Sequence, residues 1–184
     1  MRLLFIATYI VAMGISIVGY SMSPEHVATH FGIGGQPDGW MSKEVSLGFF
    51  LVLKTMLFLL MWFTPVLVTR IPSRWVNLPN KDYWLTESRM PQTKAKMDRS
   101  MSEFGAAIMV FFIFVELVVL EANLFDPAQL DERIFLTAMG LYLAYVVVWT
   151  VRLYRGFRKP AGAWPPVGSP ATKGRSTMGP DEGI

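Results

Sequence analysis

Two charged residues, Lys54 and Glu116, interrupt long apolar runs of the sequence. A charge inside a membrane-spanning helix costs at least about 2.5 kcal/mol near the bilayer centre, so it usually faces a partner or a cavity. Counted from the ends of their runs, both residues lie about 12–14 Å deep from the same side of the membrane. We therefore predict a buried Lys54–Glu116 ion pair. Such a pair either neutralises two buried charges or serves a proton or substrate path, unless Lys54 snorkels or Glu116 is protonated.

The two histidines, His26 and His30, are four residues apart, with Glu25 adjacent and Asp38 nearby. On a helix, this spacing puts both imidazoles on one face, where they could hold Zn²⁺ or Cu²⁺ together with a carboxylate. The glutamate does not occupy the His-Glu-x-x-His order of metalloproteases. The simpler interpretation is a hydrogen-bonded His30 and an exposed His26, and a pH sensor is a further alternative. We expect no metal at this site.

The remaining sequence offers no recognisable catalytic machinery. The chain has no Cys, which excludes disulfides, thiolate metal sites and thiol nucleophiles. No Ser/His/Asp arrangement, P-loop or dinucleotide fingerprint is present. The net charge of +3 is small and dispersed, which argues against nucleic acid as a partner. We predict that the protein is not an enzyme and needs no cofactor.

The elements that carry these residues are predicted to be membrane helices. Hydrophobic residues make up 52% of the chain and charged residues 17%, against about 25% charge in soluble domains. The apolar residues fall into four runs, at about 3–22, 46–69, 103–125 and 134–154, each long enough for a bilayer. The first run is too long for a signal peptide and lacks a cleavage motif. The predicted fold is an all-α membrane protein, a four-transmembrane-helix bundle.

Basic residues set the predicted orientation of this bundle. They concentrate between the second and third runs and after the fourth, and they are scarce in the other loops. By the positive-inside rule, both chain termini lie in the cytoplasm. Residues 1–160 then form the membrane domain, with an outer loop at 23–45 and a cytoplasmic loop at 70–102. Residues 161–184, rich in Pro and Gly, are predicted to be a disordered cytoplasmic tail. A helical period from about Thr93 predicts that a cytoplasmic helix continues into the third span.

The outer loop has mixed local signals. Residues 36–39, Gln-Pro-Asp-Gly, suit a type I turn. Three glycines just before them oppose a helix. Val27, Thr29 and Phe31 alternate as a strand would. We expect irregular structure packed on the membrane surface.

Two segments carry an order of residues that resembles a known family. The first segment follows the first predicted helix and has, in order, a Pro, a His-Phe pair, a Gly-x-Pro-Asp-Gly turn sequence and a Ser-Lys pair. Its residues include Pro24, His30, Phe31, Pro37, Asp38, Gly39 and Lys43. The cytoplasmic loop has a second signature that includes Asn77, Pro79, Asn80, Lys81, Tyr83 and Trp84. Both resemble the DUF1648 family of bacterial membrane proteins. Ala28 departs from the pattern, where a second Pro is common.

The cytoplasmic signature mixes aromatic and basic side chains. Residues 77–80 suit a turn that would present Lys81 and the residues after it. Tyr83, Trp84 and the nearby Trp75 are expected to anchor the loop at the lipid headgroups, where rings and positive charges are favoured. Docking of a partner protein is the alternative.

The resemblance implies a multi-pass protein of the bacterial cytoplasmic (inner) membrane. Some relatives join this module to a second membrane domain, in the SdpI type of immunity protein, which acts against a secreted peptide toxin; nothing here resembles that second domain. Our leading hypothesis is a non-enzymatic binding, immunity or accessory component that acts through its outer loop. Its partners would be the lipid bilayer and a membrane protein or an extracytoplasmic peptide. The alternatives are a small transporter or proton-linked channel using Lys54 and Glu116, and a metal-dependent membrane enzyme using His26 and His30.

Overall fold

Four long helices dominate the computed structural model, which describes residues 1–160. They are α1 (Arg2–Met22), α2 (Lys43–Arg70), α4 (Met90–Asn123) and α5 (Glu132–Gly156). All four are long and apolar enough to cross a membrane. These helices indicate a multi-pass membrane protein, as the apolar runs predict. The predicted tail at 161–184 lies outside the described residues.

The helices extend past the apolar runs because polar residues continue or cap them. The Ser42 hydroxyl accepts a hydrogen bond from the Val45 N–H at the start of α2, 3.4 Å away. The Asp131 carboxylate accepts bonds from two backbone N–H groups at the start of α5. Both are N-cap arrangements that satisfy otherwise unpaired donors. The predicted helical entry into the third span is present, since α4 begins at Met90.

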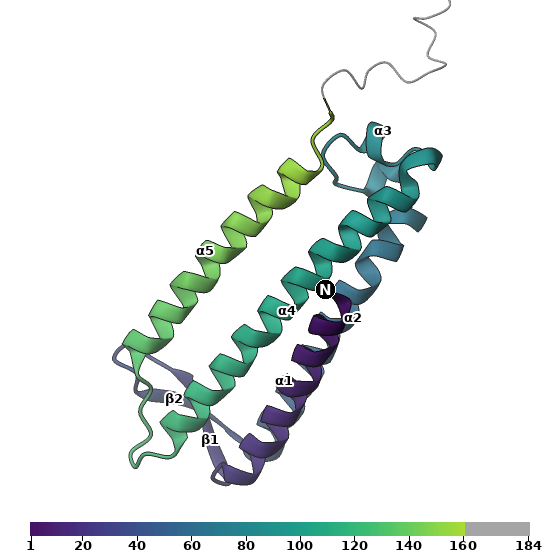
Figure 1. Ribbon diagram of the computed structural model, residues 1–184. Helices are drawn as coiled ribbons and strands as arrows, with labels where there is room; N and C mark the ends of the chain where they lie inside the picture. The colour runs from purple at the N-terminus through teal and green to yellow at the C-terminus, as the bar shows by residue number, and fades with distance from the viewer. Residues whose placement is uncertain (161–184) are drawn as a thin grey trace, which may run out of the picture.

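Three of the helices, α1, α2 and α4, pack together, while α5 packs mainly on α4 (Figure 1). Stacked rings make much of the contact between α4 and α5. Phe104 stacks on Trp149 with ring centroids 4.4 Å apart, and Phe111 stacks on Tyr142 at 4.2 Å. The outlying position of α5 leaves its opposite face apolar and exposed, as suits a helix in lipid.

The segment between α1 and α2 is a β-hairpin, so the expectation of irregular structure is wrong. Strand β1 (His26–Phe31) pairs antiparallel with β2 (Pro37–Ser42). The hairpin lies across one end of the bundle, which we call the hairpin end (Figure 1). The fold is therefore mostly helical, with a two-stranded sheet.

The chain reversal in this hairpin precedes the predicted turn at 36–39. The Gly32 N–H donates to the Gln36 carbonyl, 2.8 Å away, and the loop between them makes the reversal. Gly34 and Gly35 have φ angles of 81° and 73°, a left-handed conformation that glycine adopts without steric cost. The glycines thus form the turn, and Pro37 is the first residue of the second strand.

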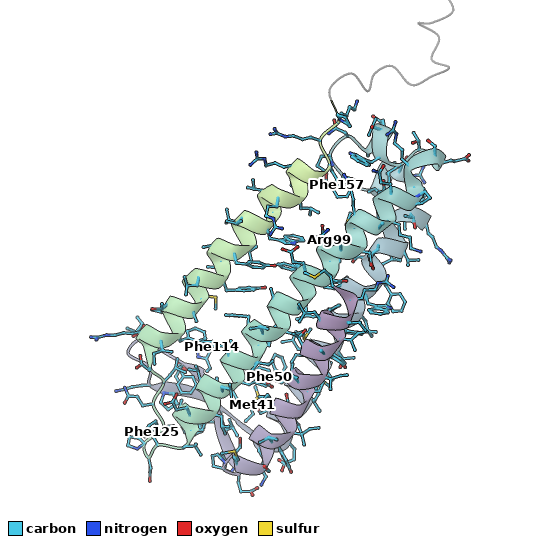
Figure 2. The ribbon with its side chains drawn as sticks, in the orientation of Figure 1. Met41, Phe50, Arg99, Phe114, Phe125 and Phe157 are labelled. Carbon is cyan, nitrogen blue, oxygen red and sulfur yellow. The ribbon has the colours of Figure 1, made fainter. Side chains whose placement is uncertain are left out.

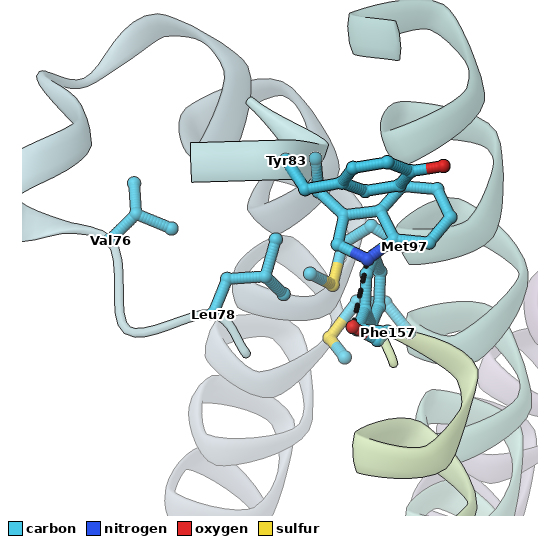
Figure 3. Packing of buried hydrophobic residues seen from close by; sticks show 7 residues of the cluster. Val76, Leu78, Tyr83, Met97 and Phe157 are labelled. Atoms are coloured by element: carbon cyan, nitrogen blue, oxygen red, sulfur yellow. Dashed lines mark hydrogen bonds between the residues drawn. The ribbon is translucent and has the colours of Figure 1, made fainter. Parts of the chain in front are cut away.

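The opposite end of the bundle, which we call the α3 end, carries three short helices between α2 and α4. These are η1 (Ser73–Trp75), α3 (Lys81–Trp84) and η2 (Glu87–Arg89). They enclose a small core together with the end of α5 (Figure 3), and its buried members are Val76, Leu78, Tyr83, Trp84, Met97, Met101 and Phe157.

The expectation that both ring residues of α3 anchor the chain at lipid headgroups is wrong. Tyr83 is 7% exposed and Trp84 is 3% exposed, so these rings contact protein. Trp75 differs from them in being largely exposed. The rings turn inward because the end of α5 supplies Phe157, which packs edge-on against Trp84.

Candidate functional site

The ammonium group of Lys54 lies at the centre of the three packed helices with no exposed surface. Its Nζ donates to Glu116 Oε2 at 2.7 Å, to the Ala12 carbonyl at 2.7 Å and to the Ser16 hydroxyl. An ammonium group has three protons, so each proton has an acceptor. The structure thus brings Lys54 and Glu116 into the predicted contact, between α2 and α4.

Ser16 closes this network from α1. Its hydroxyl accepts from Lys54 and donates to Glu116 Oε1 at 2.6 Å. Both carboxylate oxygens of Glu116 therefore have a donor. A buried charge pair is tolerated when its remaining hydrogen-bonding capacity is satisfied, and here one residue from each of three helices does so. We call Ser16, Lys54 and Glu116 the ion cluster.

A cavity of about 50 Å³ lies between the hairpin-end halves of α1, α2 and α4. It reaches from Ser23 and Val27 near the hairpin down to Ser16 and Glu116 of the ion cluster. The volume is enough for a few water molecules. Most of its other lining side chains are apolar, and they include Ile15, Leu47, Phe50, Leu117, Val119 and Leu120.

Tightly packed apolar residues lie beyond the ion cluster, toward the α3 end. Phe5, Ala12 and Met109 are buried there and form one cluster with Ala106. A Cβ atom on Gly105 would lie 2.5 Å from the ring of Phe5, so α1 and α4 approach closely at this point. The cavity therefore ends at the ion cluster, and packed side chains fill the space below it.

One buried amide fixes the hairpin to the helices. The Asn123 side chain accepts from the Ala28 N–H at 2.7 Å and donates to the Ala28 carbonyl at 2.9 Å. Both backbone groups of Ala28 are thereby used on the side of β1 that faces α4. Sequence reasoning missed Asn123, although an amide at the end of an apolar run is a usable signal. It also missed Ser16, a single hydroxyl in the first run.

The hairpin turn is held by the connection between α4 and α5. The Leu130 N–H donates to the Gly35 carbonyl at 2.9 Å, and the Gln129 side chain donates to the Gly34 carbonyl at 3.1 Å. The Gly34 N–H donates to Glu132 at 3.1 Å. A Cβ atom on Gly35 would lie 2.1 Å from the Leu130 carbonyl oxygen, so only glycine allows this approach.

Three residues of the outer-loop motif stabilise the hairpin itself. His30 Nδ1 is hydrogen-bonded to Asp38 Oδ1 across the strands. Gly39 lies opposite His30, and a Cβ atom there would be 2.9 Å from the His30 Cβ. Asp38 and Gly39, the second and third residues of β2, thus provide a hydrogen-bond partner and space for the histidine. Phe31 packs into a neighbouring apolar cluster with Leu130.

Lys43 and Pro24 lie where the hairpin joins the helices. Pro24 lies in the link between α1 and β1. Lys43 Nζ forms an ion pair with Glu25 at 2.6 Å, and its ammonium lies over the ring of Tyr20. The Lys43 backbone N–H donates to the Glu25 carbonyl at 3.1 Å. These contacts close the base of the hairpin at the edge of the cavity.

The helical premise of the histidine metal site is wrong because His26 and His30 lie on a strand. Four residues along a strand span about 13 Å, against about 6 Å along a helix. Within residues 1–160, no group of three or more His, Asp or Glu side chains could hold a metal ion.

The second motif lies at the α3 end, far from the ion cluster. Asn77 and Pro79 belong to the turn predicted at 77–80, of which the structure has Pro79 and Asn80 as a turn directly before α3. The Lys81 side chain donates to the Ser73 carbonyl at 3.2 Å. Asn80 and Trp84 both donate to the Phe157 carbonyl, at 2.9 and 2.8 Å (Figure 3). This motif therefore holds the end of α5 and has no contact with the cavity.

Part of the chain matches the model of a known protein family. The model of DUF1648, a domain of unknown function, matches residues 7–54. These residues contain α1, the hairpin and α2 as far as Lys54, so the match includes two of the three residues of the ion cluster. No curated protein and no solved structure matches the chain. The α1–hairpin–α2 unit, which supplies Ser16, Lys54 and the outer-loop motif, is thus the part of the chain that matches the DUF1648 domain.

Proposed function

We propose that this protein is a non-enzymatic binding component of the bacterial cytoplasmic membrane, and that its hairpin binds an extracytoplasmic peptide segment by strand addition. The observation that supports this most is the free outer edge of β2. Among residues 1–160 the sheet has two strands, and no third strand pairs with that edge. A free sheet edge of this kind can bind an extended peptide through its backbone groups.

The register of the hairpin identifies the backbone groups that the peptide would use. Ala28 lies opposite Trp40, and both backbone groups of Ala28 are bonded to Asn123. In an antiparallel pair, opposite residues either both bond across the pair or both point away from it. The Trp40 N–H and carbonyl therefore point to the outer edge of β2, where a peptide strand would meet them.

Side chains of the hairpin add apolar contact area beside this edge. Ile33 at the turn is 98% exposed and Trp40 is 54% exposed. Exposed aromatic side chains are frequent binding anchors. Asn123 and the α4–α5 connection hold the hairpin in place, which lowers the entropy lost on binding. The cavity below Val27 could take an apolar side chain of the same peptide.

The proposed orientation puts the hairpin outside the cell and both chain termini inside. It follows from the basic residues of the segment at 70–102 and of the chain after α5. Because the chain has no Cys, single-cysteine variants test it cleanly. In intact cells, a membrane-impermeant thiol reagent should label an Ile33→Cys variant and leave a Lys81→Cys variant unlabelled. The reverse pattern would refute the orientation.

An ion-conducting or proton-transporting role has less support. A transported ion needs access to Lys54 and Glu116 from both sides of the membrane, whereas Phe5 and Met109 fill the space toward the α3 end. All three ammonium protons of Lys54 are already hydrogen-bonded. The ion cluster is better suited to fixing three helices beneath the hairpin. An immunity role, as in the distant relatives with a second domain, would be one use of peptide binding.

The test of peptide binding is photocrosslinking from the hairpin in native membranes. A photoreactive amino acid at position 33 should give a discrete polypeptide adduct. Trp40→Pro should abolish the adduct because it removes the outward N–H, and proline is tolerated at a free strand edge. Trp40→Ala keeps the N–H and should retain part of the adduct.

Two outcomes would contradict the proposal. One is an absence of any polypeptide adduct at position 33, and the other is an adduct of equal yield in the Trp40→Pro variant. A proton-linked role would instead predict that Lys54→Met abolishes function while leaving the adduct intact. Hydrogen exchange of the hairpin amides controls for unfolding of the Trp40→Pro variant.

A further inference from the structure

A second pocket lies at the other end of the molecule, between the α3-end turns of α4 and α5. Its volume is about 210 Å³. Figure 2 labels Arg99 on the stretch of α4 beside α5, and Phe157 marks the end of α5. The pocket is separate from the ion cluster, the hairpin and the proposed peptide site.

Positive charge dominates the lining of this pocket. Lys96, Arg99 and Arg152 contribute three positive charges, and Glu103 contributes one negative charge, which leaves two positive charges in excess. The Glu103 carboxylate accepts from Arg152 at 2.8 Å. Lys96 donates to the Gly156 carbonyl at 2.9 Å and lies over the ring of Trp84. These contacts hold two of the cations in position.

Arg99 is the cation that remains available. It is exposed, and it makes no hydrogen bond or ion pair within residues 1–160. A guanidinium has five N–H donors in a planar fork that matches the oxygens of a phosphate group. An unpaired guanidinium that shares a pocket with two held cations is therefore suited to an anionic phosphate.

The level of the pocket along the helices favours a lipid as the source of that phosphate. The charged first part of α4 ends at Glu103, and the next charged residue of this helix is Glu116, after an apolar run. Trp149 stacks on Phe104 directly below the charges, at the position where a membrane–water interface is expected. Next to the pocket, Val148 and Val151 of α5 are exposed apolar side chains along which acyl chains can lie.

We propose that this pocket binds the phosphate headgroup of an anionic phospholipid. Arg99 is its main ligand, with Lys96 and Arg152 as flanking cations, and the acyl chains extend along α5. Basic pockets between membrane helices are a known mode of lipid recognition. A bound lipid would add to the contacts that hold this end of α5 against α4.

The experiment uses the full chain purified in a neutral detergent and titrated with phosphatidylglycerol or phosphatidylcholine in mixed micelles. Bound lipid is counted by native mass spectrometry, and thermal unfolding provides a second readout. We expect saturable binding and stabilisation by phosphatidylglycerol alone. Arg99→Gln should weaken that binding by about fivefold or more, because one interfacial cation is lost. Lys94→Gln removes the same charge from the same helix, outside the pocket, and should bind like the parent.

Three results would overturn the proposal. They are equal binding of the two lipids, an unchanged phosphatidylglycerol affinity in Arg99→Gln, and an equal loss in Lys94→Gln. A titration with soluble glycerol phosphate distinguishes a lipid ligand from a free phosphate ligand. Stabilisation by it at a similar concentration would assign the site to a soluble phosphate. If Arg99→Gln fails to fold, the Glu103→Gln variant replaces it as the test. This change frees Arg152 from its ion pair and should tighten phosphatidylglycerol binding. An affinity that does not rise would overturn the proposal.

Discussion

Replacing Glu116 by Gln tests whether the ion cluster holds the three packed helices together. The substitution keeps the shape of the side chain and removes its charge. Lys54 would then keep its acceptors at Ala12 and Ser16 but lose the carboxylate 2.7 Å away. Because Lys54 is fully buried, its positive charge would be left without a counter-charge, which the neutral amide cannot supply. We therefore expect a large destabilisation from an almost isosteric change.

The size of the effect follows from the burial of the pair. Removing one partner of a buried ion pair typically costs about 3–5 kcal/mol. For a chain of this size, each kcal/mol lowers the unfolding temperature by about 2–4 °C. Glu116→Gln should therefore lower it by roughly 6–20 °C. The double variant Lys54→Met/Glu116→Gln should be more stable than Glu116→Gln, because it leaves no buried charge without a partner.

The assay is thermal unfolding of the purified full chain in detergent, followed by intrinsic Trp fluorescence. Glu121→Gln is the matched control, since it removes a carboxylate from an exposed position on the same helix. It should change the unfolding temperature by less than about 2 °C, as expected of a surface substitution. A similarly small change in Glu116→Gln would refute the reasoning. A double variant no more stable than the single variant would do so as well.

Three further changes test other contacts of the fold. Asn123→Ala leaves two buried backbone groups of β1 without partners, at about 1–3 kcal/mol each, and should speed hydrogen exchange in the hairpin; unchanged exchange would show that the amide does not hold it. Gly105→Ala pushes a Cβ atom against Phe5 and should lower the free energy of unfolding by about 1–3 kcal/mol. Gly140→Ala, with open space around it, should leave the free energy of unfolding unchanged, and equal effects of the two changes would contradict the close packing. Phe157→Ala should cost about 3–5 kcal/mol and release the end of α5 to limited proteolysis, and a protease-resistant variant would argue against this role.

The four spans could be predicted because their signal is local. A run of about 20 apolar residues matches the bilayer thickness wherever the rest of the chain lies. The contact between Lys54 and Glu116 could be anticipated for a related reason. Depth along a helix is fixed by its rise per residue, and two opposite charges at one depth in a membrane have few other partners.

The hairpin could not be placed in the same way. Its turn depends on Gly34 and Gly35, which are held by residues of the α4–α5 connection. Its docking depends on Asn123, which is 95 residues from Ala28 in the sequence. A short polar segment with mixed signals takes the structure that its distant partners allow, and those partners are invisible to a local pattern.

Burial at the α3 end was likewise decided by tertiary structure. The sequence shows aromatic and basic residues together, which is typical of a membrane interface, and Trp75 keeps that character. Tyr83 and Trp84 are buried instead, because Phe157 returns at the end of α5 and offers a ring and a carbonyl acceptor. Hydropathy along the chain determined which segments enter the membrane. The packing of α5 on α4 decided which rings are buried. It also brought Lys96, Arg99 and Arg152 into one pocket. Such a pocket forms only where two helices, some 50 residues apart in the sequence, meet at the same level.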